Sequence, residues 1–192
     1  MNNFLNISIF FNIFILLHCT LGLERTKLMP NLPAGKYKLK FKAAFSCNKS
    51  IDYLINIDFH LSKASPTITL LTGTATFKIP FDDSLYYNIN MAIWSKIGGW
   101  KDNAFVYKNK GACSMLKFFF GNTWKHLVQA EDCPVQAGTY HLKGYDLSLI
   151  SQANFPKEFF YGTYKYKLFY TDDKFVEVGC FFIIFDLLRP WE

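Results

Sequence analysis

Large apolar residues and polar residues alternate along most of the chain after residue 30. Between Lys36 and Lys42 every second residue is a lysine, and Tyr37, Leu39 and Phe41 stand between them. The same period of two returns at 51–61, 85–93 and 164–168. This pattern is typical of a strand with one buried face and one solvated face. Four further runs, 67–79, 105–107, 139–150 and 175–188, read as extended, which gives seven or eight strands.

One segment breaks the alternation. Between Cys113 and Ala130 the apolar residues recur at helical spacing, first Met115, Phe118 and Phe119 and then Trp124, Leu127 and Val128. We therefore expect a short helical segment near 114–128. Turn residues separate the strands at intervals typical of a sandwich. The predicted class is all-β, with two antiparallel sheets packed face to face.

The first residues resemble a secretory signal peptide. Residues 4–17 are mostly apolar, no charged side chain precedes Glu24, and Thr20-Leu21-Gly22 ends the run. A membrane anchor is the alternative, but the run of about 14 residues falls short of the roughly 20 that span a bilayer. We expect residues 1–22 to be removed and residues 23–192 to form a single domain. The protein is then secreted, either to the extracellular space or to the lysosomal lumen.

Removal of the signal peptide leaves four cysteines, and an even number in an exported chain favours two disulfides. Three connectivities can be drawn. The pairs Cys47–Cys180 and Cys113–Cys133 are preferred, because the first joins an early strand to the last one and the second joins neighbours in sequence. The long loop is worth about 4–5 kcal/mol in the chain-entropy model. No two cysteines have the spacing of a structural zinc site, so no metal is expected.

Several short motifs occur together in a specific order. Cys113-Ser114-Met115-Leu116-Lys117 is similar to the Cys-x-x-Leu-Lys signature of a large insect family of secreted proteins. Cys133-Pro134, Gly138-x-Tyr140, Phe155-Pro156 and Tyr161-Gly162-x-Tyr164-Lys165 match the second half of that family in order and spacing. That family, of mostly unassigned function, resembles the ML lipid-recognition superfamily, which includes the ganglioside activator. The resemblance covers about residues 30 to 188.

The resemblance implies an immunoglobulin-like sandwich whose two sheets splay to hold a lipid in a cavity between them. It also implies that there are no catalytic residues. In the superfamily an early cysteine commonly pairs with one on the last strand and a second pair closes a shorter loop, roles that the two preferred disulfides would match. This chain has only two pairs, fewer than the ganglioside activator.

The aromatic residues suggest where a lipid would lie. A cleft lined by rings can bury an acyl chain at about 0.8 kcal/mol per CH₂. The candidate lipid-binding residues are Phe41, Phe59, Phe77, Tyr87, Met115, Phe118, Phe119, Tyr166 and Phe182. Lys117 and Lys125 are candidates for contact with a phosphate or a sugar acid. For any one ring, simple core packing is the competing explanation.

The remaining sequence features argue against some functions and partners more than they favour others. The chain has neither Gly-x-Ser-x-Gly nor His-Glu-x-x-His, so we expect no enzyme and no cofactor. Asn48-Lys49-Ser50 is a glycosylation sequon. The net charge of +6 and the predicted export favour transient contact with a membrane surface over nucleic acid. The expected function is a secreted, monomeric, non-enzymatic protein that holds a lipid or another hydrophobic small molecule. The alternative is an extracellular interaction or signalling module, in chemosensation or defence, with a closed core.

Overall fold

The computed structural model of the protein describes residues 32–192. The predicted signal peptide at residues 1–22 lies outside this range. The described residues form ten strands, which are β1 (Ala34–Lys36), β2 (Lys38–Ser46), β3 (Ile55–Lys63), β4 (Thr69–Phe77), β5 (Tyr86–Ser95), β6 (Gly99–Lys110), β7 (Gly138–Asp146), β8 (Glu158–Phe160), β9 (Gly162–Thr171) and β10 (Glu177–Leu188). The helical elements are α2 (Ala112–Phe120), η3 (Gly121–Thr123), α3 (Trp124–Val128) and η4 (Leu147–Gln152). The predicted helical segment near 114–128 is therefore confirmed.

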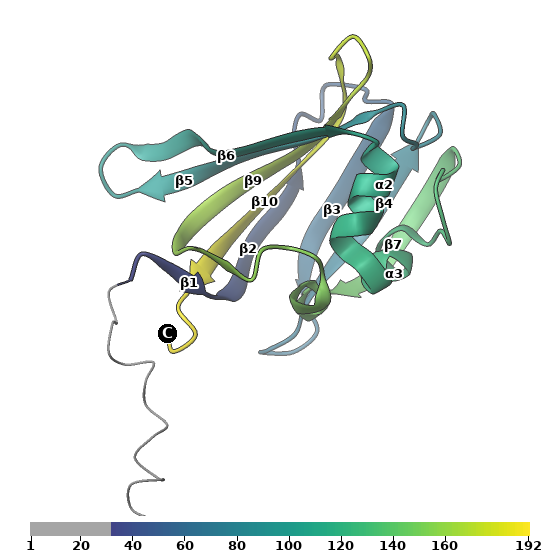
Figure 1. Cartoon of the computed structure of the whole chain (residues 1–192). Helices are drawn as coiled ribbons and strands as arrows, with labels where there is room; N and C mark the ends of the chain where they lie inside the picture. Colours follow the sequence, from purple (N-terminus) through teal and green to yellow (C-terminus); the bar gives the residue numbers. More distant parts are fainter. Residues whose placement is uncertain (1–31) are drawn as a thin grey trace, which may run out of the picture. The chain divides into compact units, whose positions relative to one another are not determined.

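Backbone hydrogen bonds connect eight of these strands in the order β6-β5-β9-β10-β3-β4-β7, with β2 also paired to β10. Strands β1 and β8 form a separate pair. The link from β10 to β3 is a single parallel pair, Gly179 with Ile55. The eight strands therefore divide there into two layers, which we call the five-stranded layer (β6-β5-β9-β10-β2) and the three-stranded layer (β3-β4-β7) (Figure 1). The predicted all-β sandwich is confirmed.

The core lies between the two layers. From the five-stranded layer it takes buried residues such as Tyr87, Ile89 and Phe181, and from the three-stranded layer it takes Ile57 and Leu71. Rings of opposite layers meet directly, as Phe59 of β3 does with Phe181 of β10 at 5.7 Å between ring centroids. The alternation of the sequence produces this arrangement because successive side chains of a strand point to opposite faces. Helices α2 and α3 lie in front of the three-stranded layer in Figure 1 and cover one side of the core.

Two glycines mark places where backbones approach too closely for a side chain. A Cβ on Gly73 would lie 2.1 Å from the carbonyl oxygen of Asp58. The pairing of β4 with β7 shifts register between Leu71 and Gly73, but the extra residue lies on β7, where Lys143 and Gly144 stand opposite Thr72. The irregularity expected at Gly73 is therefore a bulge of the partner strand. A Cβ on Gly179 would lie 2.7 Å from the carbonyl oxygen of Ile55, which explains why a glycine occupies the junction between the layers.

Several expected boundaries differ from the structure, among them the run 51–61, where strand β3 begins only at Ile55 and Ile51 is exposed. Strand β6 is far longer than the expected run 105–107, because its exposed outer residues hide the alternation. Strand β7 ends at Asp146, where the Asp146 carboxylate accepts a hydrogen bond from the Ser148 amide and caps η4, so the run 139–150 is only partly strand. The last strand begins at Glu177, and Phe175 lies in the turn before it.

Both predicted disulfides are present. Cys47, directly after β2, joins Cys180 of β10, with 5.6 Å between the Cα atoms. Cys113 of α2 joins Cys133, which lies in the segment before β7, with 5.9 Å between the Cα atoms. The first disulfide secures the edge strand β2 to the strand beside it, and the second attaches the helical segment to the approach to β7.

Candidate functional site

Two hollows lie close to each other within the sandwich. The first, which we call the inner cavity, has a volume of about 100 Å³ and lies between the two layers and the helices. Its lining is almost wholly apolar and comes from both layers and both helices, and the amide of Gln129 is an exception. Its residues include Ala75 of β4, Leu116 of α2 and Phe181 of β10. A lining of this kind favours hydrocarbon over water.

The second hollow, which we call the cleft, has a volume of about 640 Å³. It lies between β2, the turn that joins β3 to β4, η4 and residues 155–157. Apolar side chains contribute part of its lining, among them Leu39, Phe41, Ile150 and Phe155. This volume falls within the range of small-molecule sites, about 300–1,000 Å³, whereas the inner cavity alone is below it.

Four lysines and one acid line the cleft, namely Lys38, Lys40, Lys63, Lys157 and Asp146. The Lys63 ammonium donates to the Thr69 hydroxyl at 2.7 Å, and that of Lys157 donates to the backbone oxygens of Ser151 and Ala153 at 3.1 and 2.8 Å. Lys38 and Lys40 alternate with Leu39 and Phe41, so their side chains point away from the apolar lining, and the Lys38 ammonium donates to the main-chain oxygen of Glu192 at 3.2 Å. The ammonium groups of Lys63 and Lys157 remain at the cleft, and no side-chain carboxylate of residues 32–192 forms an ion pair with either of them. The cleft therefore combines an apolar lining with an excess of positive charge.

Two phenylalanine rings lie where the hollows adjoin. Phe155 lines the cleft, Phe120 lines the inner cavity, and the ring centroids are 5.7 Å apart. Phe155 also stacks on Phe119 at 5.3 Å. We call Phe120 and Phe155 the ring partition. The contact between Phe120 and Phe155 thus joins the lining of the cleft to that of the inner cavity.

The candidate residues separate into four groups. Phe59 and Phe77 line the inner cavity, and Phe41 lines the cleft. Tyr87, Phe119 and Tyr166 pack within the core and line neither hollow. Met115 is partly buried, and its sulfur accepts a hydrogen bond from the side-chain amide of Asn109. Phe118 is 57% exposed on the outside of α2.

Phe182 is the one candidate on the wrong face. Phe181 is buried and lines the inner cavity, whereas Phe182 packs on the exposed ring of Phe45 at 5.4 Å between centroids. The run from Cys180 to Ile184 contains no polar residue to mark the solvated side. A strand that is apolar on both faces leaves its register undetermined by the sequence pattern.

The helical segment faces the core largely as expected, since Trp124 and Val128 are buried and Met115, Phe119 and Leu127 pack against the core, but Phe118 is exposed. The spacing of Met115, Phe118 and Phe119 pointed to one buried stripe, but the buried residues of α2 are Ala112, Cys113 and Leu116. Leu116 and Phe120, four residues apart, are the two that reach the inner cavity. The sequence contains this i, i+4 pair, but the prediction rested on the neighbouring Phe118 and Phe119 instead.

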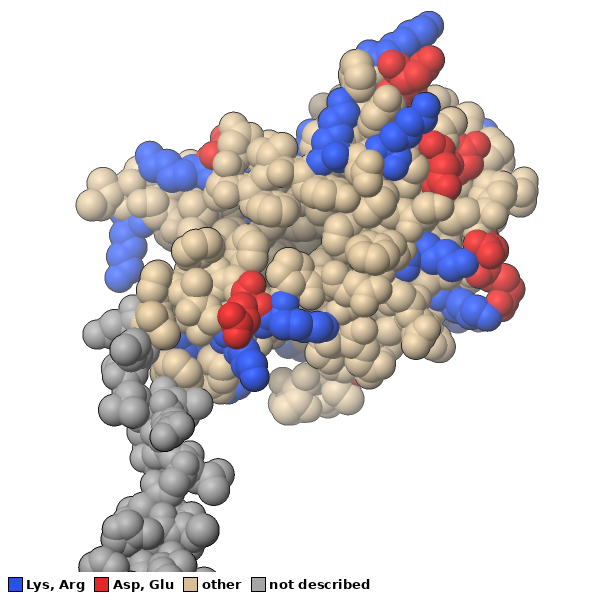
Figure 2. All heavy atoms as spheres, in the orientation of Figure 1, with Lys and Arg blue, Asp and Glu red and all other residues tan. Residues whose placement is uncertain are grey.

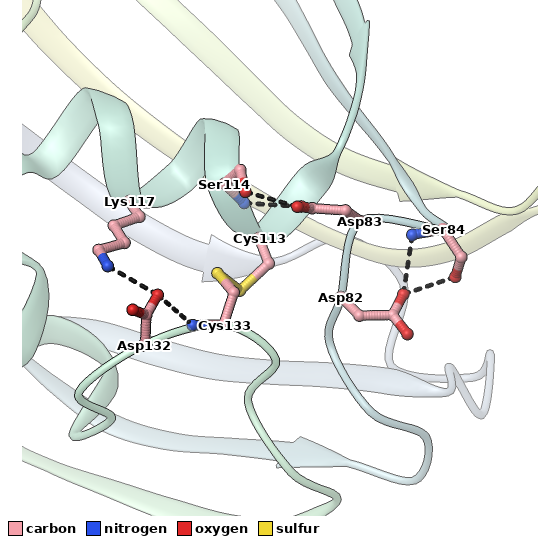
Figure 3. Close-up of a disulfide and its surroundings, with 8 residues drawn as sticks. All are labelled: Asp82, Asp83, Ser84, Cys113, Ser114, Lys117, Asp132 and Cys133. Carbon is pink, nitrogen blue, oxygen red and sulfur yellow. Dashed lines mark hydrogen bonds and ion pairs between the residues drawn. A yellow bond between two sulfur atoms is a disulfide. The ribbon is translucent and has the colours of Figure 1, made fainter.

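Lys117 and Lys125 meet acids of the protein itself rather than an open site. The Lys117 ammonium contacts Asp132 at 2.7 Å, and Lys125 pairs with Glu131. The Asp132 carboxylate also accepts a hydrogen bond from the Cys133 amide at 2.8 Å (Figure 3). Lys117 and this amide hold the pKa of the Asp132 carboxyl below its usual value. Both lysines are thus already paired in the structure.

The neighbouring acids act in turns and at a helix end. The Asp82 carboxylate accepts from the Ser84 amide at 2.9 Å, as expected for a turn residue. Asp83 accepts from the Ser114 amide at 2.8 Å and from the Ser114 hydroxyl, which places a carboxylate at the start of α2 (Figure 3). Such a contact stabilises a helix by satisfying an amide that has no partner within the helix. The residues of the Cys-x-x-Leu-Lys motif thus make contacts that stabilise the fold.

The tyrosines of the core are held neutral. Tyr87 and Tyr170 are both buried, and burial raises the pKa of each phenol well above its usual value. The Tyr87 hydroxyl lies 3.2 Å from that of Tyr166. Because these phenols keep their protons at neutral pH, they leave the interior between the layers uncharged.

Comparison with known proteins assigns the chain to no family. No protein-family model matches the chain, and no curated protein matches it. Among residues 32–192, no cluster of three or more His, Cys, Asp or Glu side chains is arranged to hold a metal ion. The helices within this range include none that is both long and apolar enough to cross a membrane.

Proposed function

We propose that the protein is an exported, non-enzymatic binder of an amphiphilic lipid with an anionic head group. The observation that carries this proposal is the cleft of about 640 Å³, with its apolar lining and the ammonium groups of Lys63 and Lys157, beside the apolar inner cavity. An acyl chain on the apolar lining gains about 0.8 kcal/mol for each CH₂ removed from water. The lysines supply charge complementary to a carboxylate or a phosphate.

The ring partition extends this proposal. The inner cavity alone, at about 100 Å³, is smaller than the roughly 300–1,000 Å³ of small-molecule sites, so it holds only part of a lipid chain. A lipid chain in the cleft reaches the inner cavity once Phe155 and Phe120 turn aside. Phe59 and Phe77 then contact the end of the chain, and Phe41 contacts the part nearer the head group. The likeness of the cysteine-bounded motifs to the ML lipid-recognition superfamily supports the same ligand class.

Two features support export. Two disulfides are typical of proteins that fold in an oxidising compartment. Asn48 of the glycosylation sequon is exposed in the turn after Cys47, where an oligosaccharide has room. A secreted lipid carrier that acts alone fits both, either outside the cell or in the lysosomal lumen.

Native mass spectrometry of the protein purified from the medium of expressing cells tests the proposal. We expect an added mass that organic extraction identifies as lipid, and uptake of a fluorescent fatty acid by the delipidated protein. Lys63→Gln, in the cleft, is expected to weaken fatty-acid uptake about fivefold through the loss of about 1 kcal/mol. Lys174→Gln, an exposed lysine in the turn before β10, is the matched control and should behave as the wild type. A clean apo mass together with no uptake refutes lipid binding.

The small inner cavity favours a second candidate, an extracellular interaction or signalling module with a closed core. This candidate predicts that Lys63→Gln changes nothing and that the wild-type protein carries no lipid at all. The same two measurements therefore separate the candidates.

A further inference from the structure

The hairpin of β5 and β6 ends in a turn with an apolar residue at its apex. Ile97 is 87% exposed, the largest value among the exposed large apolar side chains of residues 32–192, and Trp94 beside it is 50% exposed. Hairpin turns are usually occupied by polar residues and glycine. Exposing an isoleucine side chain to water at this turn is therefore unfavourable, and no burial in the core offsets the cost.

The turn holds Ile97 in this position. The Ser95 hydroxyl accepts a hydrogen bond from the Ile97 amide at 3.3 Å and lies 3.0 Å from the Ile97 carbonyl oxygen, to which it donates. Gly98 and Gly99 adopt left-handed backbone angles, with φ of 91° and 66°. Only glycine takes such angles without strain, so the sequence specifies a defined turn. The turn therefore holds Ile97 in one defined, exposed position.

Aromatic rings and lysines surround the apex. Trp94 and Trp100 face each other across the hairpin, with 5.2 Å between ring centroids, and the Lys165 ammonium lies 5.2 Å from the Trp100 ring. Lys96 and Lys101 are exposed on either side of the turn, and no described acid forms an ion pair with them. Figure 2 shows blue lysine or arginine atoms at this end of the hairpin. The nearest acid in the hairpin is Asp102.

We infer that this hairpin end, Trp94 to Lys101, docks on a membrane surface that carries anionic lipids. Tryptophan rings favour the boundary between head groups and acyl chains, because one edge of the indole is polar and the rest is apolar. Ile97 then reaches the hydrocarbon, while Lys96 and Lys101 remain among the phosphates, where each lysine contributes about fivefold to binding. The positive apex selects a negatively charged lipid surface as its partner.

Strand pairing places this surface relative to the cleft. Ile93 pairs with Tyr164, Tyr164 with Phe185, and Phe185 with Phe41. The row ends at the part of β2 that lines the cleft, so the hairpin end and the cleft lie toward the same end of the five-stranded layer. Docking would therefore turn this end toward the bilayer, although the docking itself does not depend on what the cleft binds.

Vesicle co-sedimentation of the purified full chain tests the inference. We expect the wild type to bind phosphatidylcholine vesicles that contain phosphatidylserine, with a shift of tryptophan emission to shorter wavelength. Ile97→Ser is expected to weaken this binding about tenfold, since a buried isoleucine side chain contributes that much or more. Combined Lys96→Gln and Lys101→Gln should cost about thirtyfold on the anionic vesicles and leave the weak binding to pure phosphatidylcholine unchanged.

Val176→Ser is the matched control. Val176 is a β-branched residue, 57% exposed in the turn between β9 and β10, at the opposite end of the same layer. This variant should bind vesicles as the wild type does. The inference is overturned if the wild type does not sediment with anionic vesicles, or if Ile97→Ser and Val176→Ser bind equally. It is also overturned if Ile97→Ser abolishes capture of a protein partner while vesicle binding persists. Fatty-acid uptake by Ile97→Ser should remain normal, which separates this test from that of the cleft.

Discussion

Filling the inner cavity should make the protein more stable and a poorer lipid binder. Ala75 lies in the middle of the three-stranded layer, paired with Ile57 on one side and Tyr140 on the other, and all three residues line the cavity. Ala75→Leu adds three carbon atoms. At about 0.8 kcal/mol for each, this burial contributes about 2.4 kcal/mol. The cavity of about 100 Å³ leads to the same figure, since lost packing costs about 24 cal/mol per Å³.

Urea unfolding monitored by circular dichroism measures this gain, and fluorescent fatty-acid uptake measures the accompanying loss of binding. Ala92→Leu is the matched control, because Ala92 is also a buried strand alanine but does not line the cavity. Overpacking should destabilise this variant by about 1–3 kcal/mol. If Ala75→Leu loses as much stability as Ala92→Leu does, the interior is already filled. If Ala75→Leu is more stable yet takes up fatty acid as the wild type does, the lipid does not use the inner cavity.

Three further predictions concern stability. Removal of the Cys47–Cys180 disulfide by alanine at both positions should cost up to about 5 kcal/mol, because it closes a loop of 133 residues; an unchanged urea midpoint would contradict the entropic argument. The phenol of Tyr87 titrates higher in the folded protein than in the unfolded chain, so its contribution to stability should be complete below about pH 10 and decline above it by about 1.4 kcal/mol per pH unit, in addition to the decline from other buried phenols such as Tyr170. Denaturant titrations at alkaline pH should show a shallower fall for Tyr87→Phe, and equal slopes would be inconsistent with a buried, neutral phenol. Gly73→Ala should lose at least about 2 kcal/mol, since its Cβ meets the Asp58 backbone; wild-type thermal stability would show that the two strands separate readily.

The sequence predicted those parts of the fold that follow from alternation and covalent pairing. In β2 the lysines of 36–42 lie outside and Tyr37, Leu39 and Phe41 pack on the core, as period two requires. Both disulfides follow from four cysteines whose strand positions were legible. Gly73 marked the place of a pairing irregularity, although the extra residue lies on the partner strand β7 and not on β4.

The sequence pattern failed where both faces of a strand have the same character. Strand β6 is exposed on nearly all sides, and Asp102, Asn103 and Ala104 stand opposite Ala92 alone, because Lys101 pairs with Ile93 and Phe105 with Met91. This bulge removes the period of two. In β10 the run around Phe182 is hydrophobic on both faces, so the sequence pattern again does not show which face is buried.

The cleft could not be predicted, because it is a product of tertiary structure. Lys63 belongs to strand β3 and Lys157 to a distant loop, and each one alone reads as a solvated lysine. Only the packing of η4 against the turn between β3 and β4 brings them around one hollow. Residues 155–157 complete it from a segment that has little regular structure.

The junction at Gly179 and Ile55 has a consequence for how the interior can change size. One parallel residue pair is the entire backbone link between β10 and β3. Moving the sheets apart along the rest of their length therefore breaks no ladder and costs mainly side-chain contacts, which an incoming hydrocarbon replaces. The resting volume between them is accordingly a lower bound on what the protein can enclose.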